Sequence, residues 1–230
     1  MPTHSEIYAR HAAEYEQLVS REDFQGNILR AIQRIVPLDG LDVLDLGSGT
    51  GRLACLLTPF VKSMVAIDAS THMLQVAAAK LSSLGGHQPL VAAGDHRRLP
   101  LRAGSADLIV SGWSVSYVTL WNAGAWREAA EQWFDEVRRV LRKPGYVVVF
   151  ESLGTGNEVP MRLPHLEHFY GWLDEMGFAN QWIRTDYRFE SAEVADELTG
   201  FFFGEDVRRR LRRQQPITLP ECTGVWWMRL

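Results

Sequence analysis

Residues 43–54 read Val43-Leu44-Asp45-Leu46-Gly47-Ser48-Gly49-Thr50-Gly51-Arg52-Leu53-Ala54. An apolar segment with one acid leads into alternating glycines and then into a segment that can be helical. This pattern predicts a buried strand, a tight turn and a helix N-terminus. The glycines permit positive φ angles and let a ligand approach the bare backbone. The helix start presents free N–H groups and a partial positive charge, so the stretch predicts a nucleotide-binding unit.

Three glycine-rich motifs compete for this turn. A phosphate-binding P-loop requires Gly-Lys-Ser/Thr, whereas Arg52 follows the last glycine here. The dinucleotide motif G-x-G-x-x-G/A fits only if it starts at Gly49 and ends at Ala54, which leaves two extra residues after the strand. The third motif, D-x-G-x-G-x-G, fits from Asp45 to Gly51 without adjustment.

Further short apolar segments downstream also end in acids. Residues 64–68 end at Asp68, about 20 residues beyond the glycines, where a carboxylate can accept both hydroxyls of a ribose. Either Ser70 or Thr71 can cap the helix that follows. Residues 90–95 predict a third strand ending at Asp95, which can accept a hydrogen bond from an adenine amine, and residues 106–111 predict a fourth strand.

Taken in this order, residues 41–150 resemble the successive motifs of class I S-adenosylmethionine-dependent methyltransferases, of the small-molecule type. The resemblance implies an α/β fold: a Rossmann-like, doubly wound, seven-stranded sheet, mostly parallel with an antiparallel last strand, in an α/β/α sandwich. It also implies S-adenosyl-L-methionine as the cofactor and S-adenosyl-L-homocysteine as the product. The cofactor contacts are then expected from Asp45, Gly47, Ser48, Gly49, Gly51, Asp68, Ala69, Met73, Asp95, His96, Ser111 and Tyr15.

Composition is typical of one ordinary globular domain. The 230 residues are 46% hydrophobic, which suffices for one sizeable core. A formal charge of −4 provides no field that would attract nucleic acid, and no apolar run approaches the roughly 20 residues that span a bilayer. Two cysteines form no disulfide framework, and the first six residues lack a signal-peptide core, so a cytoplasmic location is expected.

The predicted elements suggest a single methyltransferase domain over residues 1–230. Two helices before the first strand would form an N-terminal helical cap over residues 1–38. An amphipathic helix from Trp126 would end at Lys143-Pro144-Gly145, and strands are expected over residues 146–150, near 181–190 and over 223–230.

The last two predicted strands lie unusually far apart. The methyltransferase class usually joins its last strands by a short hairpin, whereas residues 191–218 form a helical insert here. The insert contains Phe201-Phe202-Phe203 and a helix expected from Glu205 through the arginines at 208–213. The arginine run is either a solvated helix end or an anion site. The phenylalanines are either a lid over the ligand cleft or structural packing.

The acceptor side is expected at the turn after the fourth strand. That turn lacks the Asn/Asp-Pro-Pro-Tyr/Phe motif that nucleic-acid and protein amide methyltransferases often carry, which favours a small-molecule substrate. Trp113 and Tyr117 can form an aromatic wall there, Glu151 is a candidate base, and Phe202 can contact the acceptor. The resemblance implies that an N-terminal tyrosine, Tyr15, either closes over the methionine end of the cofactor or simply packs on the sheet. The sequence contains no evident set of metal ligands.

The predicted reaction is an in-line displacement that moves a methyl group from the cofactor to a small-molecule acceptor. Orientation alone can supply much of the acceleration. Two alternatives stay open at this point: a protein that binds S-adenosylmethionine but transfers nothing, and an NAD(P)-dependent oxidoreductase. The sequence identifies neither the methyl acceptor nor a catalytic base, and it leaves the oligomeric state undetermined.

Overall fold

The computed structural model describes residues 4–85 and 88–230. Residues 1–3, which belong to the expected N-terminal cap and to the start tested for a signal peptide, lie outside the described residues. The helices are α1 (His4–Arg10), α2 (Ala12–Val19), α3 (Asn27–Ile35), α4 (Arg52–Leu57), α5 (Thr71–Ser82), α6 (Val115–Trp121), α7 (Trp126–Val140), α8 (Glu167–Glu175), α9 (Ala192–Phe202) and α10 (Glu205–Arg208). The strands are β1 (Asp42–Leu46), β2 (Ser63–Asp68), β3 (Leu90–Ala93), β4 (Ala106–Gly112), β5 (Leu141–Thr155), β6 (Ala179–Arg184), β7 (Tyr187–Phe189), β8 (Ile217–Leu219) and β9 (Glu221–Arg229).

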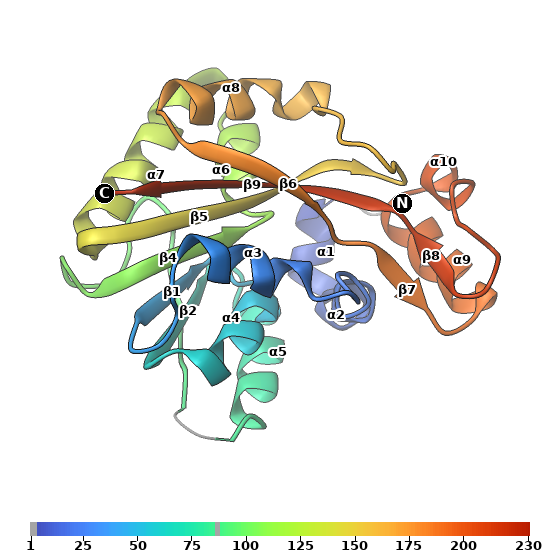
Figure 1. Ribbon diagram of the computed structural model, residues 1–230, viewed down its shortest axis with the longest axis horizontal. Helices are drawn as coiled ribbons and strands as arrows, with labels where there is room; N and C mark the ends of the chain where they lie inside the picture. Colours follow the sequence, from blue (N-terminus) through green and yellow to red (C-terminus); the bar gives the residue numbers. More distant parts are fainter. Residues whose placement is uncertain (1–3, 86–87) are drawn as a thin grey trace.

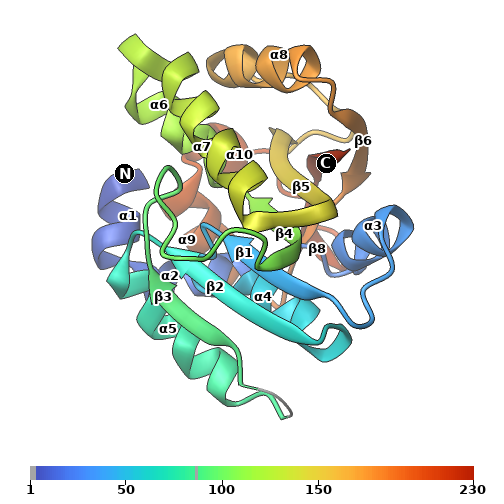
Figure 2. The same cartoon turned by 90° about the vertical axis from the view of Figure 1, so that its left-hand side faces the viewer.

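Seven strands form one twisted sheet in the order β3-β2-β1-β4-β5-β9-β6 (Figure 1). Strand β9 runs antiparallel to both of its neighbours, and the other pairs are parallel. Helices cover both faces of the sheet (Figure 2). The expected seven-stranded α/β/α fold with an antiparallel last strand is therefore confirmed. Strand order reverses between β1 and β4, which is where ligands bind in such sheets.

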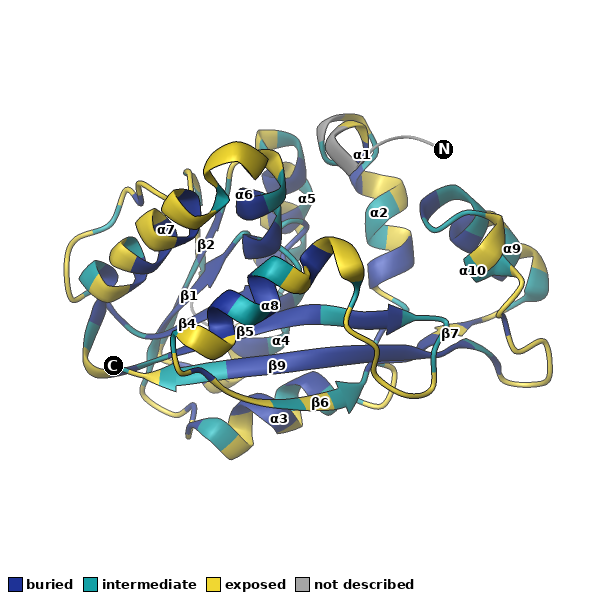
Figure 3. Cartoon of the chain, turned by 90° about the horizontal axis from the view of Figure 1, so that it is seen from above, coloured by how far each residue is buried: buried dark blue, intermediate teal, exposed yellow. Residues whose placement is uncertain are grey.

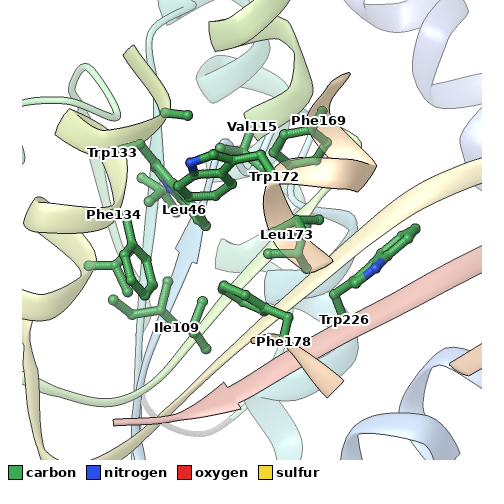
Figure 4. Close-up of a cluster of buried hydrophobic side chains, with 14 of the residues drawn as sticks. Leu46, Ile109, Val115, Trp133, Phe134, Phe169, Trp172, Leu173, Phe178 and Trp226 are labelled. Carbon is green, nitrogen blue, oxygen red and sulfur yellow. The ribbon is translucent and has the colours of Figure 1, made fainter. Parts of the chain in front are cut away.

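Each face of the sheet has its own apolar core. Helices α7 and α8 cover one face, where Trp133 and Trp172 meet edge to face with ring centroids 6.0 Å apart (Figure 4). On the other face, α3 and α4 bury residues such as Ile32 and Leu57. Helix α7 is amphipathic, and its outer face is exposed (Figure 3). Strands β5 and β9, which lie inside the sheet, are largely buried. The two cores hold the strand ends at fixed positions.

Several boundaries differ from the sequence predictions; among them, β3 ends at Ala93, which leaves Asp95 in the loop that follows. The N-terminal region forms three helices rather than two, and α3 packs into the core beneath the sheet because Ile28 and Ile32 lie on one face of it. Helix α7 ends at Val140, and β5 begins at once. The strand expected near 181–190 divides into β6 and β7, because Asp186 leaves the main sheet to pair with Arg184 and accept the Glu221 N–H.

We use the term cap for residues 4–19 and 187–219, which lie together beyond one end of the sheet (Figure 1). The cap contains α1, α2, α9, α10 and the two-stranded β7–β8 sheet, and its buried side chains form a third apolar cluster. The prediction that one helix runs from Glu205 through the arginines at 208–213 is wrong, because α10 ends at Arg208. Arg208 and Arg213 instead pair with Asp196, at 3.0 and 2.7 Å, which folds the run back on α9.

Candidate functional site

The turns after β1, β2 and β4 enclose a first cavity at the carboxyl ends of the strands. Its walls come mainly from the glycine turn, the end of β2, the start of α5 and the segment around Trp113. The lining residues are Tyr8, Tyr15, Val19, Asp45, Gly47, Ser48, Gly49, Thr50, Arg52, Leu53, Asp68, Ala69, Ser70, Met73, His96, Gly112, Trp113, Ser114, Tyr117, Val118 and Trp121.

The glycine turn depends on two residues for different reasons. Gly47 has a φ of +76°, and a Cβ added there would lie 1.8 Å from the Ser114 Oγ atom and 2.8 Å from His96 Cε1. A Cβ added to Gly49, whose φ is +53°, would meet no atom within 4 Å. The first glycine therefore lets the protein pack closely on itself, and the second leaves the cavity side of the backbone open to a ligand.

Asp68 closes the first cavity at the end of β2. Its Oδ2 accepts the Gly49 N–H at 2.9 Å and its Oδ1 accepts the Ser70 N–H at 2.7 Å. A carboxylate has about four acceptor positions, so each oxygen can accept one more hydrogen bond. Burial raises the pKa of Asp68. The side chain thus holds the turn in place and can also accept ligand hydroxyls.

Several buried polar atoms of this cavity have no hydrogen-bond partner among the described residues. They are Asp45 Oδ1, Ser48 Oγ, Thr50 Oγ1, Arg52 Nη2 and His96 Nδ1. Burial raises the pKa of Asp45 to about 7 and lowers that of His96 to about 4, so the imidazole is neutral at physiological pH. Buried polar groups are normally satisfied, so these atoms point to a polar ligand or ordered water in the first cavity.

A second cavity of about 330 Å³ lies between the cap and the sheet and shares a wall with the first. Its lining combines aromatic side chains of the cap with acids from the sheet. The lining residues are Ile7, Tyr8, Tyr15, Leu18, Val19, Glu22, Arg52, Trp113, Ser116, Tyr117, Leu120, Glu151, Ser152, Thr155, Leu163, His165, Leu166, Tyr187, Phe202, Phe203 and Glu221.

The shared wall is aromatic and carries a guanidinium group. Trp113 has a φ of +48°, a strained angle for a bulky residue, and its ring stacks on Phe150 at 6.1 Å. The Arg52 guanidinium lies over the Trp113 ring, 4.4 Å from its centroid. Tyr8 packs edge to face on Tyr117 with ring centroids 5.6 Å apart, which joins the cap to the turn after β4.

Charged side chains gather at the sheet end of the second cavity. Glu22 forms an ion pair with Arg52 at 2.6 Å and accepts the Tyr187 hydroxyl at 2.9 Å. Glu221 accepts the Ser152 hydroxyl at 2.6 Å. Burial raises the pKa of Glu151 to about 7 and that of Glu221 to about 8. Both carboxyl groups can therefore change protonation state near neutral pH.

Most of the sequence-predicted site residues line one of the two cavities. The first cavity collects the predicted cofactor residues Asp45, Gly47, Ser48, Gly49, Asp68, Ala69, Met73, His96 and Tyr15. The second contains all four predicted acceptor residues, Trp113, Tyr117, Glu151 and Phe202.

Three predicted cofactor residues lie elsewhere. Asp95 is half exposed and pairs with Arg97 at 2.8 Å, so its carboxylate faces a neighbour on its own loop instead of the cavity. Ser111 is fully buried and donates to the Leu46 carbonyl at 2.8 Å, which ties β4 to β1. Gly51 allows α4 and α5 to approach, because an added Cβ would lie 3.1 Å from that of Ala77.

The sequence analysis did not identify the charged and hydrogen-bonding residues at the sheet end of the second cavity. Glu22, Tyr187 and Glu221 carry no motif and are far apart in the sequence, and Arg52 was noted only as a departure from the P-loop. A polar residue opening an apolar terminal strand, as Glu221 does, is the one local signal that could have identified any of them.

Two further searches cover residues 4–85 and 88–230. Within these ranges, no three His, Cys, Asp or Glu side chains are grouped so that they could hold a metal ion. Every helix in the same ranges is too short or too polar to cross a bilayer.

Comparison with known proteins gives one consistent result. Residues 44–149 match the family model of the methyltransferase domain. Over 180 residues the chain is 32% identical to the malonyl-[acyl-carrier protein] O-methyltransferase of Marinomonas sp. (strain MWYL1), covering 77% of this chain and 60% of the relative. It is 27% identical to the demethylmenaquinone methyltransferase of Lactococcus lactis subsp. lactis (strain IL1403), covering 64% of this chain and 57% of the relative. The chain thus spans about 60% of the length of these curated relatives.

A solved structure supports the fold. A protein from Methanococcus maripaludis, assigned as an S-adenosylmethionine-dependent methyltransferase, superimposes with a TM-score of 0.59. The match has 22% sequence identity and covers 80% of this chain and 91% of that one.

Proposed function

Because the chain carries a class I S-adenosylmethionine-dependent methyltransferase domain, we propose that it transfers a methyl group from S-adenosylmethionine to a small-molecule acceptor. One observation carries the proposal: two cavities adjoin at the switch point of the sheet and share Tyr8, Tyr15, Arg52, Trp113 and Tyr117 as a common wall. The first cavity takes the cofactor and the second takes the acceptor.

The residues of the first cavity fit the cofactor. Asp68 accepts the ribose hydroxyls, and the open backbone at Gly49 lets the cofactor lie against the turn. Ala69 and Met73 contact the adenine, and the unpartnered atoms near His96 are available to its polar groups. When bound, the cofactor supplies a methyl group on a positively charged sulfonium.

The residues between the cavities orient the acceptor and keep water away. Tyr15 and Tyr117 are part of the shared wall and contact both cavities. Side chains in this position hold the cofactor and the acceptor next to each other, and such orientation can supply much of the acceleration. Glu151 is the side chain best suited to hold a proton from the acceptor, because it is buried in the second cavity and its pKa is about 7.

The relatives leave the acceptor open. Their names give two different acceptors, a malonyl group on a carrier protein and demethylmenaquinone, and this chain spans about 60% of their length. The acceptor therefore has to be argued from the second cavity itself.

Two measurements test the proposal. S-adenosylhomocysteine should bind at micromolar concentration or tighter, seen by calorimetry, and should raise the melting temperature by mass action. The protein with S-adenosylmethionine and a metabolite extract should release S-adenosylhomocysteine. Binding without release would identify a protein that binds the cofactor and transfers nothing. Stabilisation by a nicotinamide cofactor alone would instead identify an oxidoreductase.

A further inference from the structure

Three carboxyl side chains converge on the second cavity from separate parts of the chain. Glu22 follows α2, Glu151 lies on β5 and Glu221 opens β9, and each is about nine-tenths buried or more. Each has one carboxyl oxygen without a hydrogen-bond partner among the described residues. The described lining holds a single guanidinium, that of Arg52, whose Nη1 pairs with Glu22 and whose Nη2 has no partner among the described residues. The cavity therefore has more acids than its own cations can balance.

Aromatic rings surround the same acids. Tyr15 packs on Phe202 with ring centroids 6.1 Å apart, and Phe203 packs on Tyr187 at 5.8 Å. Ring faces attract organic cations, an attraction that strengthens when the cation is desolvated. Acids and rings together recognise a charged amine better than either a carboxylate or an uncharged group.

An anionic acceptor fits this cavity poorly. Its carboxylate would have to bind the Arg52 Nη2 atom, which has no partner among the described residues, beside Glu22, which already holds Nη1 at 2.6 Å. It would also lie beside Glu151 and Glu221 and could bind only while both stay protonated, because their carboxylates would repel it in a buried site.

We infer that the second cavity binds a small organic ammonium ion, so that the methyl acceptor is an amine. This inference rests on the proposed function and deepens it by naming the acceptor class. The amine donates to the unpartnered carboxyl oxygens, and its apolar part lies among the cap rings. Before it can accept a methyl group, the ammonium must lose one proton, and the Glu151 carboxylate is placed to take it.

The protonation of the acids gives the binding a distinctive pH dependence. Burial holds the pKa of Glu151 at about 7 and that of Glu221 at about 8, so an incoming cation displaces protons from them at neutral pH. Affinity for an amine should rise as pH rises through these values and then fall when the amine itself deprotonates. The other titratable or charged groups facing the two acids are Tyr8 and Tyr187 from the cap, and Glu22, Arg52, Tyr117, His165, Tyr170 and Cys222 from the rest of the chain.

Three probes of one shape test the inference without any cofactor. Calorimetry of the full chain should show benzylamine binding at least about tenfold more tightly than benzyl alcohol, because hydrogen bonds to charged groups are the stronger ones. Benzoate should bind most weakly, and benzylamine should release protons, seen as a heat that depends on the buffer. Equal affinity for amine and alcohol, tightest binding of benzoate, or no benzylamine binding at millimolar concentration would overturn the inference.

Matched variants show whether the acids of this cavity are responsible. Glu221→Gln keeps the shape of the side chain, and it should weaken benzylamine about tenfold while leaving benzyl alcohol unchanged. Glu151→Gln should do the same if the first variant does not fold. Glu16→Gln is the control, since Glu16 also has an unpartnered oxygen but pairs with Lys80 and lines neither cavity. An equal loss in all three variants would contradict the inference.

The inference and the proposed function fail separately. If S-adenosylhomocysteine binds and benzylamine does not, the methyltransferase proposal stands and the amine inference is wrong. If benzylamine binds in the acid-dependent way and S-adenosylhomocysteine does not, the cavity binds amines in a protein that is no methyltransferase.

Discussion

The two cavities share a wall, yet they are built in opposite ways. The first cavity, proposed for the cofactor and called the cofactor cavity below, is formed mainly by backbone turns at strand ends, held by hydrogen bonds such as those that Asp68 accepts from the Gly49 and Ser70 N–H groups. The second cavity, proposed for the acceptor and called the acceptor cavity below, is formed by side chains that distant segments bring together, such as Glu22 and Glu221. Recognition by backbone tolerates changes in most neighbouring side chains, whereas recognition by assembled side chains changes with a single substitution.

The two cavities also destabilise the folded protein for different physical reasons. In the cofactor cavity part of the cost is backbone strain, which glycine makes small at positions such as Gly47, and part is the burial of one acid, Asp45. In the acceptor cavity the cost is electrostatic, because Glu151 and Glu221 are buried acids with too few cations nearby. Substitutions in the two places should therefore give separable effects.

The largest effect is expected at the glycine turn. Gly47→Ala places a Cβ 1.8 Å from Ser114 Oγ at a φ of +76°, so the turn must move. We expect a stability loss of about 2–5 kcal/mol, measured by urea unfolding, and loss of S-adenosylhomocysteine binding. Gly40→Ala is the control: its φ is +77° and no atom lies within 4 Å, so only strain of about 1–2 kcal/mol is expected. Similar losses in both variants would contradict the close-packing argument.

A buried acid of the acceptor cavity should make stability depend on pH. Because folding raises the pKa of Glu151 to about 7 from 4.5, the stability that it contributes is full below the unfolded pKa and is lost as pH rises through 7. Above that pH, Glu151→Gln should be more stable than the wild type by up to about 3 kcal/mol. Urea unfolding near pH 5 and pH 8 checks this, and a constant difference between them would be against it.

Removing the acid at the end of β2 should act on the cofactor alone. Asp68→Ala removes charge-assisted hydrogen bonds worth about 1.5–3 kcal/mol, so S-adenosylhomocysteine affinity should fall about tenfold to a hundredfold. Asp68→Asn should be milder, because an amide oxygen can still accept from Gly49 or Ser70. Benzylamine affinity should stay within a few fold. A folded Asp68→Ala protein with unchanged affinity for S-adenosylhomocysteine would place Asp68 outside the site.

Trimming the cap should act on the acceptor alone, and more weakly. Phe203 lines the acceptor cavity and is half-buried, so Phe203→Ala should weaken benzylamine by about 1–2 kcal/mol and leave S-adenosylhomocysteine within a few fold. Phe202→Ala should also lower the melting temperature, because that ring belongs to the cap core. Phe201 lines neither cavity, and its ring packs on His11 and Phe202, so Phe201→Ala is the control for loss of cap packing without loss of a cavity-lining ring. Loss of both ligands in all three variants would make the phenylalanines structural packing.

The cofactor half of the molecule was predictable because its signals are local. The turn from Asp45 to Gly51 needs particular residues within a few positions of one another, and Ser70 caps α5 through the Met73 N–H at 3.3 Å, as its place before the helix suggests. Asp95 shows the limit of such reasoning. A strand-end acid can equally turn to a neighbour, and Arg97, two residues away, determines its direction.

Residues of the acceptor cavity could be predicted only where an aromatic or acidic side chain lies at the expected end of a strand, as with Trp113 and Glu151. The ion pair of Glu22 with Arg52 joins residues whose meeting depends on how the cap packs. The insert likewise gave no sign that β8 would pair with β7 and divide an expected strand. Pairings between distant segments depend on tertiary packing, which has no short sequence pattern.

The cap joins residues 4–19 to residues 187–219, with most of the sheet between them in the chain. Contacts of such long sequence separation form late in folding, because their loop-closure entropy must be offset by structure already present. The sheet and its glycine turn can therefore form before the acceptor cavity exists. We therefore expect the cap to open before the sheet in local unfolding, and such an opening would let a ligand enter or leave the space between cap and sheet without unfolding the core.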